Sequence, residues 1–172
     1  MIEKSFNPRK LLVLSSPLVT SFFFILLDSI PFYLFKDFSL KTQFGLITLY
    51  IWICLNPDSI RPFYILILGL FIDILNGFFF GFSSFFLSII LFVQKKNIRI
   101  LNSSDFKINL FRFFLIIFFI NISSAILEKS FNTDVIIHYK DLLLINLISF
   151  ITFPFLMLVV NYLNNQLKLY VE

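Results

Sequence analysis

The stretch GLFIDILNGFFFG, from Gly69 to Gly81, lies in an almost unbroken apolar run and contains a single carboxylate, Asp73. Glycines stand four residues before this acid, four residues after it and eight residues after it. A charged side chain in the middle of a membrane costs about 2.5–3.5 kcal/mol even on scales that measure insertion of helices. An acid kept there among glycines is therefore expected to have a role in packing or binding.

The composition predicts that this stretch belongs to a membrane protein. Of the 172 residues, 59% are hydrophobic and 14% are charged, whereas soluble domains carry about 25% charged residues. Because such a chain has too little polar surface to face water, we expect an integral membrane protein. No stretch is long and polar enough for a soluble domain, so residues 1–172 are expected to form one transmembrane domain.

The start of the chain and its cysteine content narrow the class of membrane protein further. The first apolar stretch is too long for a signal-peptide core and no A-x-A cleavage site is present, so we expect the first helix to be retained. Cys54 is the only cysteine, which excludes disulfides and multi-cysteine metal sites within the chain.

The apolar segments predict an all-α bundle of six membrane-spanning helices. They cover about residues 11–34, 43–56, 62–78, 80–94, 109–127 and 142–163. The third and fourth segments touch, and one helix over 62–94 would be roughly 50 Å long, far beyond a hydrocarbon core of ~30 Å. The chain is therefore expected to bend between them, where Asn76, Gly77 and Gly81 are the available turn formers.

The basic residues predict that both termini are cytoplasmic. With six spans and the N-terminus inside, ten of the 14 Lys and Arg residues fall on the cytoplasmic side and four on the outer side, as the positive-inside rule expects. The cytoplasmic loop QKKNIRILNSSDFK supplies Lys95, Lys96, Arg99 and Lys107. This loop either contacts anionic lipid or a cytoplasmic partner, or only fixes topology. Nothing further supports binding of nucleic acid.

The glycines predict that Asp73 points into the bundle. Gly69, Asp73 and Gly77 share one face of a helix, because positions four apart lie together. Glycines on that face allow a neighbouring backbone to approach closely. We therefore expect Gly69, Asp73, Gly77 and Gly81 to serve helix packing or the docking of a partner helix.

Polar residues on other spans lie at a depth similar to that of Asp73. At about 1.5 Å per residue, Asp73 lies roughly 17 Å from the cytoplasmic end of its helix. Residues at comparable depth are Thr20, Ser21, Asn121, Ser149 and Thr152, and Asn146 extends the stripe of the last span. We predict a polar layer near mid-membrane, centred on Asp73. Alternatively, these side chains only make ordinary hydrogen bonds between helices, of about 0.6 kcal/mol each.

No constellation for catalysis or metal binding is visible in the sequence. His138 is the only histidine and falls in a predicted outer loop, and the patterns H-E-x-x-H and G-x-S-x-G do not occur. Asp28, three residues before Pro31, is predicted to be interfacial and roughly 9 Å from Asp73 in depth, so the two acids are not expected to act as a pair. We expect a protein that is not an enzyme and uses no cofactor or metal.

Residues 49–92 resemble the rod-shape-determining protein MreD family. The family pattern is an aromatic pair that ends one helix, a proline in a cytoplasmic turn, then G-L-x-x-D-x-L-x-G and a second glycine. The corresponding residues here are Tyr50, Trp52, Pro57, Gly69, Leu70, Asp73, Leu75, Gly77 and Gly81. Phe80 departs from the pattern, because many members have a small residue or proline before the second glycine.

The resemblance implies a function in cell elongation. MreD-like proteins are non-catalytic subunits of the bacterial inner membrane that support peptidoglycan synthesis and rod shape. Their partners are MreC, the actin-like MreB, the glycosyltransferase RodA and a penicillin-binding transpeptidase. The family fold is similar to the substrate-binding subunits of energy-coupling-factor transporters.

A transporter subunit for a vitamin-type substrate is the alternative function. In that case the polar layer would be a ligand pocket. The first span has no Ala-x-x-x-Ala docking motif, although Ser16 and Thr20 have the same spacing. Long outer loops that could close over a ligand are also absent from the sequence, except for residues 128–141.

Overall fold

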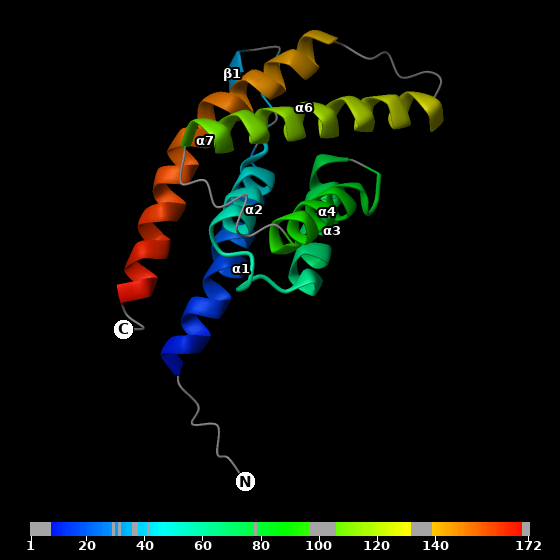
Figure 1. The fold of residues 1–172 in the computed structure, drawn as a ribbon. Coiled ribbons are helices and arrows are strands. Elements are labelled where there is room, and N and C mark those ends of the chain that lie inside the picture. Colours follow the sequence, from blue (N-terminus) through cyan, green and yellow to red (C-terminus); the bar gives the residue numbers. More distant parts are fainter. Residues whose placement is uncertain are drawn as a thin grey trace.

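The computed structural model describes residues 8–28, 30, 32–35, 38–40, 42–77, 79–96, 106–131 and 139–169. Within these residues the chain forms helices and one short hairpin, with the labels of Figure 1. The helices are α1 (Pro8–Asp28), α2 (Phe44–Leu55), α3 (Pro62–Asn76), α4 (Phe82–Lys96), α6 (Phe106–Phe131) and α7 (Tyr139–Leu169). The strands are β1 (Phe32–Phe35) and β2 (Phe38–Leu40).

The predicted all-helical class is confirmed for the described residues, apart from one short β-hairpin between α1 and α2. We expected the first span to reach residue 34, but α1 ends at Asp28 and β1 pairs antiparallel with β2, with Phe32 opposite Leu40. Pro31 explains the early end of the helix, because proline has no N–H group and disfavours helical geometry in the residue before it. The aromatic residues that follow favour an extended strand.

The predicted bend between the third and fourth segments is confirmed. Gly77 ends α3 in the left-handed conformation at φ 71°, and Gly81 precedes α4 at φ 89°. Only glycine adopts such angles at little cost, and a left-handed residue just past a helix is a common helix terminator. The two glycines therefore reverse the chain, and α3 and α4 form an antiparallel hairpin.

Helix α2 is the centre of the fold. Every residue from Gly45 to Ile53 is buried, and Figure 1 shows α2 between the second half of α7 on one side and the α3–α4 pair on the other. A helix that is apolar on all sides belongs in a core. With 12 residues, it spans about 18 Å, which is shorter than the ~30 Å of a bilayer core.

Three aromatic rings join α2 to the C-terminal helices. The ring of Phe113 on α6 stacks on Phe153 of α7 with centroids 4.5 Å apart, and Tyr50 of α2 lies 5.3 Å from Phe113. All three side chains are among the largest fully buried ones. Aromatic pairs at these distances add about 0.5–1.5 kcal/mol beyond the burial of their area.

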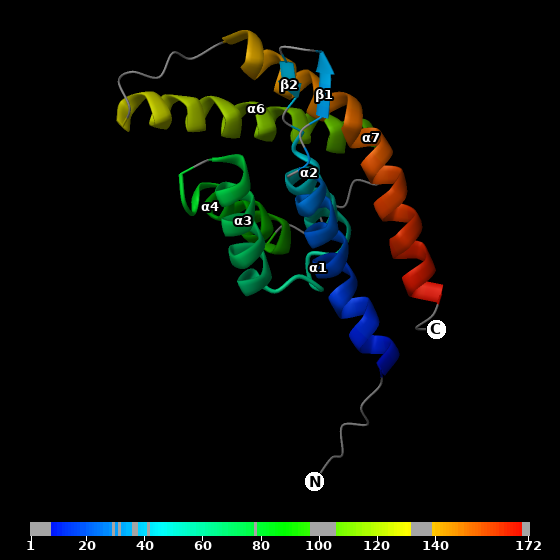
Figure 2. The same ribbon diagram turned by 180° about the vertical axis from the view of Figure 1, so that it is seen from behind.

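Helices α6 and α7 are not simple antiparallel neighbours of α1. Figure 2 shows α6 running crosswise to α1, and α7 changing direction near its middle. Pro154 lies inside α7, and a proline removes one helical hydrogen bond and kinks the helix. The start of α1 and the end of α7 lie at the same end of the molecule (Figure 1).

Among the described residues, two helices are long and apolar enough to cross a membrane. They comprise residues Phe106–Phe131 and Lys140–Gln166, and shorter apolar helices cover Ser15–Asp28, Phe44–Leu55 and Pro62–Asn76. The helical, membrane-type character of the chain is therefore supported by length and composition. The number of spans and the side of the termini stay predictions.

Cysteine labelling of α6 tests the six-span topology. Lys107 and Lys129 are exposed near opposite ends of this helix, and its 26 residues span about 39 Å. In a Cys54→Ser background, we expect Lys107→Cys and Lys129→Cys to react with a membrane-impermeant maleimide from opposite sides of the membrane. Labelling of both positions from one side would show that α6 lies along the surface and that the chain has fewer spans.

Candidate functional site: carboxyl groups that cap the next helix

Asp73 accepts hydrogen bonds from the first turn of α4. Its side chain is completely buried, and the backbone N–H of Ser83 lies 2.9 Å from Oδ1 and 3.2 Å from Oδ2. Ser83 is the second residue of α4, and the first four N–H groups of a helix have no partner within that helix. The carboxyl group of α3 therefore caps the helix that follows it in the chain.

Close packing of α3 on α4 brings this cap into place. A Cβ atom on Gly69 would lie 2.5 Å from Ser84 Oγ and 2.6 Å from Ser84 Cα, distances that no real side chain tolerates. The Ser84 hydroxyl in turn donates a 2.9 Å hydrogen bond to the carbonyl oxygen of Leu66 on α3. The predicted face of Gly69 and Asp73 is therefore covered by α4 of the same chain.

Gly77 and Gly81 do not belong to that face. A Cβ atom on either residue would meet no atom within 4 Å, and both residues have positive φ. Their contribution is to the turn that carries the chain from α3 to α4. Gly69 and Asp73 thus lie at the contact between α3 and α4, whereas Gly77 and Gly81 lie in the turn, because α3 ends at Asn76. That the four residues serve helix packing or the docking of a partner helix stays a prediction.

Asp28 repeats the same arrangement between α1 and α2. Its carboxyl oxygens accept hydrogen bonds of 2.7 Å from the N–H groups of Phe44 and Gly45, and one of 3.1 Å from the Thr42 hydroxyl. A Cβ atom on Gly45 would collide with Ile25. We expected Asp28 to be an interfacial residue, but it is partly buried and caps α2. In both helix pairs, α1–α2 and α3–α4, an acid near the end of the first helix accepts hydrogen bonds from the start of the second.

The residues of the polar layer predicted around Asp73 form their hydrogen bonds in separate parts of the structure. Thr20 accepts a 2.8 Å hydrogen bond from Trp52 Nε1 and donates to the carbonyl of Ser16. Ser149 and Thr152 donate to carbonyl oxygens of their own helix. Ser21 is buried, and its hydroxyl has no partner among the described residues.

A separate amide network lies where α2, α6 and α7 meet. Gln43 Nε2 donates a 2.8 Å hydrogen bond to Asn121 Oδ1, and Asn121 Nδ2 donates one of 2.8 Å to Asn146 Oδ1. All three side chains are buried. Sequence reasoning found Asn121 and Asn146 but missed Gln43, whose signal was an amide directly before an apolar helix. Because these buried amides are hydrogen-bonded to one another, the network fixes the position of α6 and α7 on α2.

The predicted basic loop is only partly within the described residues. Lys95 Nζ donates a 3.0 Å hydrogen bond to the carbonyl oxygen of Ile60, in the turn between α2 and α3. Lys96 and Lys107 are exposed, whereas Arg99 lies outside the described residues, as does His138. Within the described part of the chain, no three His, Cys, Asp or Glu side chains are grouped to hold a metal ion.

These observations describe a helical protein of membrane-type composition in which two acids each cap the next helix of the chain. No family model matches the chain, and no curated protein or solved structure matches it either.

Substitution of Asp73 tests whether its side chain stabilises the fold as a hydrogen-bond acceptor or through its charge. Asp73→Asn keeps an oxygen acceptor for the Ser83 N–H, whereas Asp73→Ala leaves that N–H buried without a partner. Loss of a helix cap costs about 0.5–2 kcal/mol, so we expect Asp73→Ala to lower the melting temperature in detergent clearly and Asp73→Asn to lower it little. Asp141→Ala, at an exposed acid, is the matched control. Equal melting of Asp73→Ala and the control would show that the cap adds no stability.

Substitution of Gly69 tests the close approach of α3 and α4. Gly69→Ala places a methyl group against the Ser84 backbone, and overpacking of this kind costs about 1–3 kcal/mol. We expect a lower melting temperature that Ser84→Gly in the same chain restores only in part, because the backbone contact remains. Ile74→Ala, at an exposed position of the same helix, should melt like the parent chain. Unchanged melting of Gly69→Ala would contradict the observed packing.

Proposed function

We propose that the chain is a non-catalytic membrane subunit of the bacterial cell-elongation complex, where it supports peptidoglycan synthesis and rod shape together with MreC and MreB. The proposed place is the cytoplasmic membrane, with six spans, both termini in the cytoplasm and a fold similar to the substrate-binding subunits of energy-coupling-factor transporters. RodA and a penicillin-binding transpeptidase are the further proposed partners.

The main support for this proposal is the role that the G-L-x-x-D-x-L-x-G segment has in the structure. Gly69 permits contact with α4, Asp73 caps α4, and Gly77 and Gly81 form the turn. The residues that resemble the MreD family are thus those that hold one helical hairpin in a fixed shape. A segment used in this way supports a subunit that presents rigid helices to partners.

The side chains of the aromatic pair support the same interpretation. Tyr50 and Trp52 are 1% exposed and lie in the core around α2. Trp52 Nε1 donates a hydrogen bond to Thr20 of α1, and Tyr50 contacts the rings of α6 and α7. This pair therefore connects the central helix to the N-terminal and the C-terminal parts of the bundle.

The polar side chains give less support to a transporter subunit for a vitamin-type substrate. A ligand pocket needs polar groups that are free to bind a ligand. Gln43, Asn121 and Asn146 bind one another, and Asp73 binds the start of α4. These groups are already used in contacts between helices.

Affinity purification from native membranes tests the proposed function. We expect the tagged chain, in mild detergent, to retain a single-span coiled-coil protein and the synthase pair in mass spectrometry. Asp73→Ala should lose these partners because the α3–α4 hairpin is loosened, whereas the control Asp141→Ala should retain them. Recovery of paired ATPases with a coupling subunit would instead identify a transporter component.

A further inference from the structure

A cluster of polar side chains lies where the end of α2, the end of α4 and the start of α6 come together. Gln94 Nε2 on α4 lies 3.4 Å from Cys54 Sγ on α2. The Tyr50 hydroxyl, one helical turn before Cys54, also donates a hydrogen bond to this sulfur. The guanidinium of Arg112 on α6 is close enough to Tyr50 and Cys54 to interact with both electrostatically.

The aromatic core holds α6 against α2 at the level of this cluster. Phe113 follows Arg112 in the chain, and its ring lies 5.3 Å from that of Tyr50 and 4.5 Å from that of Phe153. All three rings are fully buried. The backbone that carries Arg112 is therefore fixed beside Tyr50.

The guanidinium of Arg112 is incompletely paired. Its Nη1 is buried and has no hydrogen-bond partner among the described residues. Helices α2 and α4 contain no Asp or Glu, and the acid of α6, Glu128, lies 16 residues further along the chain. A buried charge without a counter-charge is strongly unfavourable, and buried polar groups that lack a protein partner commonly bind a water molecule or an ion.

The donors of the cluster share only a weak acceptor. Arginine carries N–H donors and no acceptor, and the donors of Gln94 and Tyr50 both point to sulfur, which is a weak hydrogen-bond acceptor. An anion accepts hydrogen bonds more strongly than sulfur and also neutralises the guanidinium. Because Nη1 is enclosed by protein atoms, a small anion fits this position better than a bulky one.

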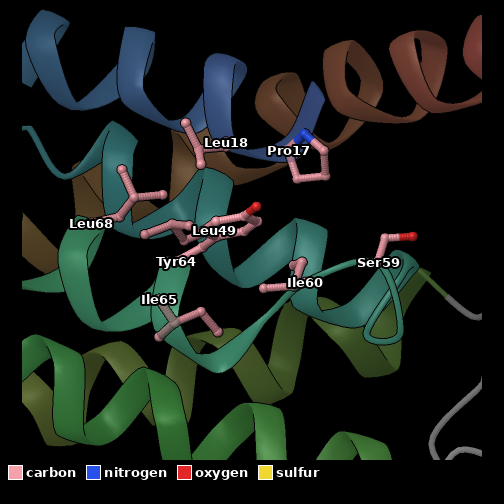
Figure 3. A pocket seen from close by; sticks show the side chains of 8 residues that line it. All are labelled: Pro17, Leu18, Leu49, Ser59, Ile60, Tyr64, Ile65 and Leu68. Atoms are coloured by element: carbon pink, nitrogen blue, oxygen red, sulfur yellow. The ribbon is translucent and has the colours of Figure 1, made fainter. Parts of the chain in front are cut away.

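The hollow in Figure 3 lacks these properties. It is lined mostly by apolar side chains of α1, α2 and α3, such as Leu18, Leu49 and Leu68, and its volume is about 10 Å³. A bound water needs about that much space together with several polar partners. The cluster around Arg112, in contrast, offers donors from three helices.

We propose that Arg112, Gln94 and Tyr50 bind one chloride ion between α2, α4 and α6. Gln94 exchanges its weak hydrogen bond to Cys54 for one to chloride, and Arg112 Nη1 gains an acceptor. The ion connects three helices and stabilises the bundle. This site is distinct from the acid caps, and it does not depend on membership of the elongation complex.

Thermal unfolding of the purified full chain in detergent tests this site. Sodium chloride is compared with sodium gluconate at equal ionic strength. We expect chloride to raise the melting temperature by about 3–6 °C at a tenfold excess over its dissociation constant. Lys96→Gln, at an exposed lysine two residues after Gln94, should keep this dependence on chloride.

Arg112→Gln should lose the dependence on chloride. In gluconate, this variant should melt no lower than the parent chain, because it removes a buried charge that has no counter-charge. In chloride, it should melt below the parent. Equal melting of the parent in both salts would overturn the proposal, as would a chloride effect that persists in Arg112→Gln or a variant that melts below the parent in both salts.

Chlorine NMR gives a readout that does not depend on stability. The chloride line should be broader with the parent chain than with Gln94→Leu, and bromide should narrow it by competition. The same line width with both chains would contradict the site, with water rather than chloride as the partner of Arg112. Because the experiment uses the isolated chain, neither result depends on its partners in cells.

Discussion

A carboxyl group can persist inside an apolar bundle only where other groups donate hydrogen bonds to it, and the first turn of a helix supplies such donors. The arrangement of the first four helices follows from this constraint. Asp28 binds the N–H groups of Phe44 and Gly45, and Asp73 binds the N–H of Ser83. The N–H groups at the start of one helix and the carboxyl group of another thus form hydrogen bonds with each other.

Close helix contact and capping depend on one another. A carboxyl group reaches the next helix only if the two backbones approach, and Gly45 and Gly69 remove the side chains that would keep them apart. The α1–α2 and α3–α4 pairs therefore share three features: a carboxyl group on the first helix, a glycine at the close contact, and N–H groups at the start of the second helix. In a membrane, where burial of apolar side chains gives little drive for helix association, such contacts decide which helices pair.

The C-terminal helices are attached by different means. α6 and α7 meet α2 through the amides of Gln43, Asn121 and Asn146 and through the stacked rings around Tyr50. Neither set involves a charged group. The central helix α2 is thus held by a carboxyl group at its start, by amides beside that start and by aromatic packing further along. Because these polar groups are used in internal contacts, many of the exposed side chains on the described helices are large and apolar.

The sequence by itself indicated a helical chain of membrane type, because its hydrophobic content is high and its charged content is well below that of soluble domains. It also located the bend between α3 and α4, since Gly77 and Gly81 are the residues that adopt positive φ there. Periodicity placed Gly69 and Asp73 on one face. The tertiary structure decided what covers that face, because the donor that Asp73 binds is a backbone N–H, which every residue type carries except proline. It likewise decided that Asp28 caps α2 and that Gln43 joins Asn121, since these pairs are 16 and 78 residues apart in the chain and no local pattern specifies such distant contacts.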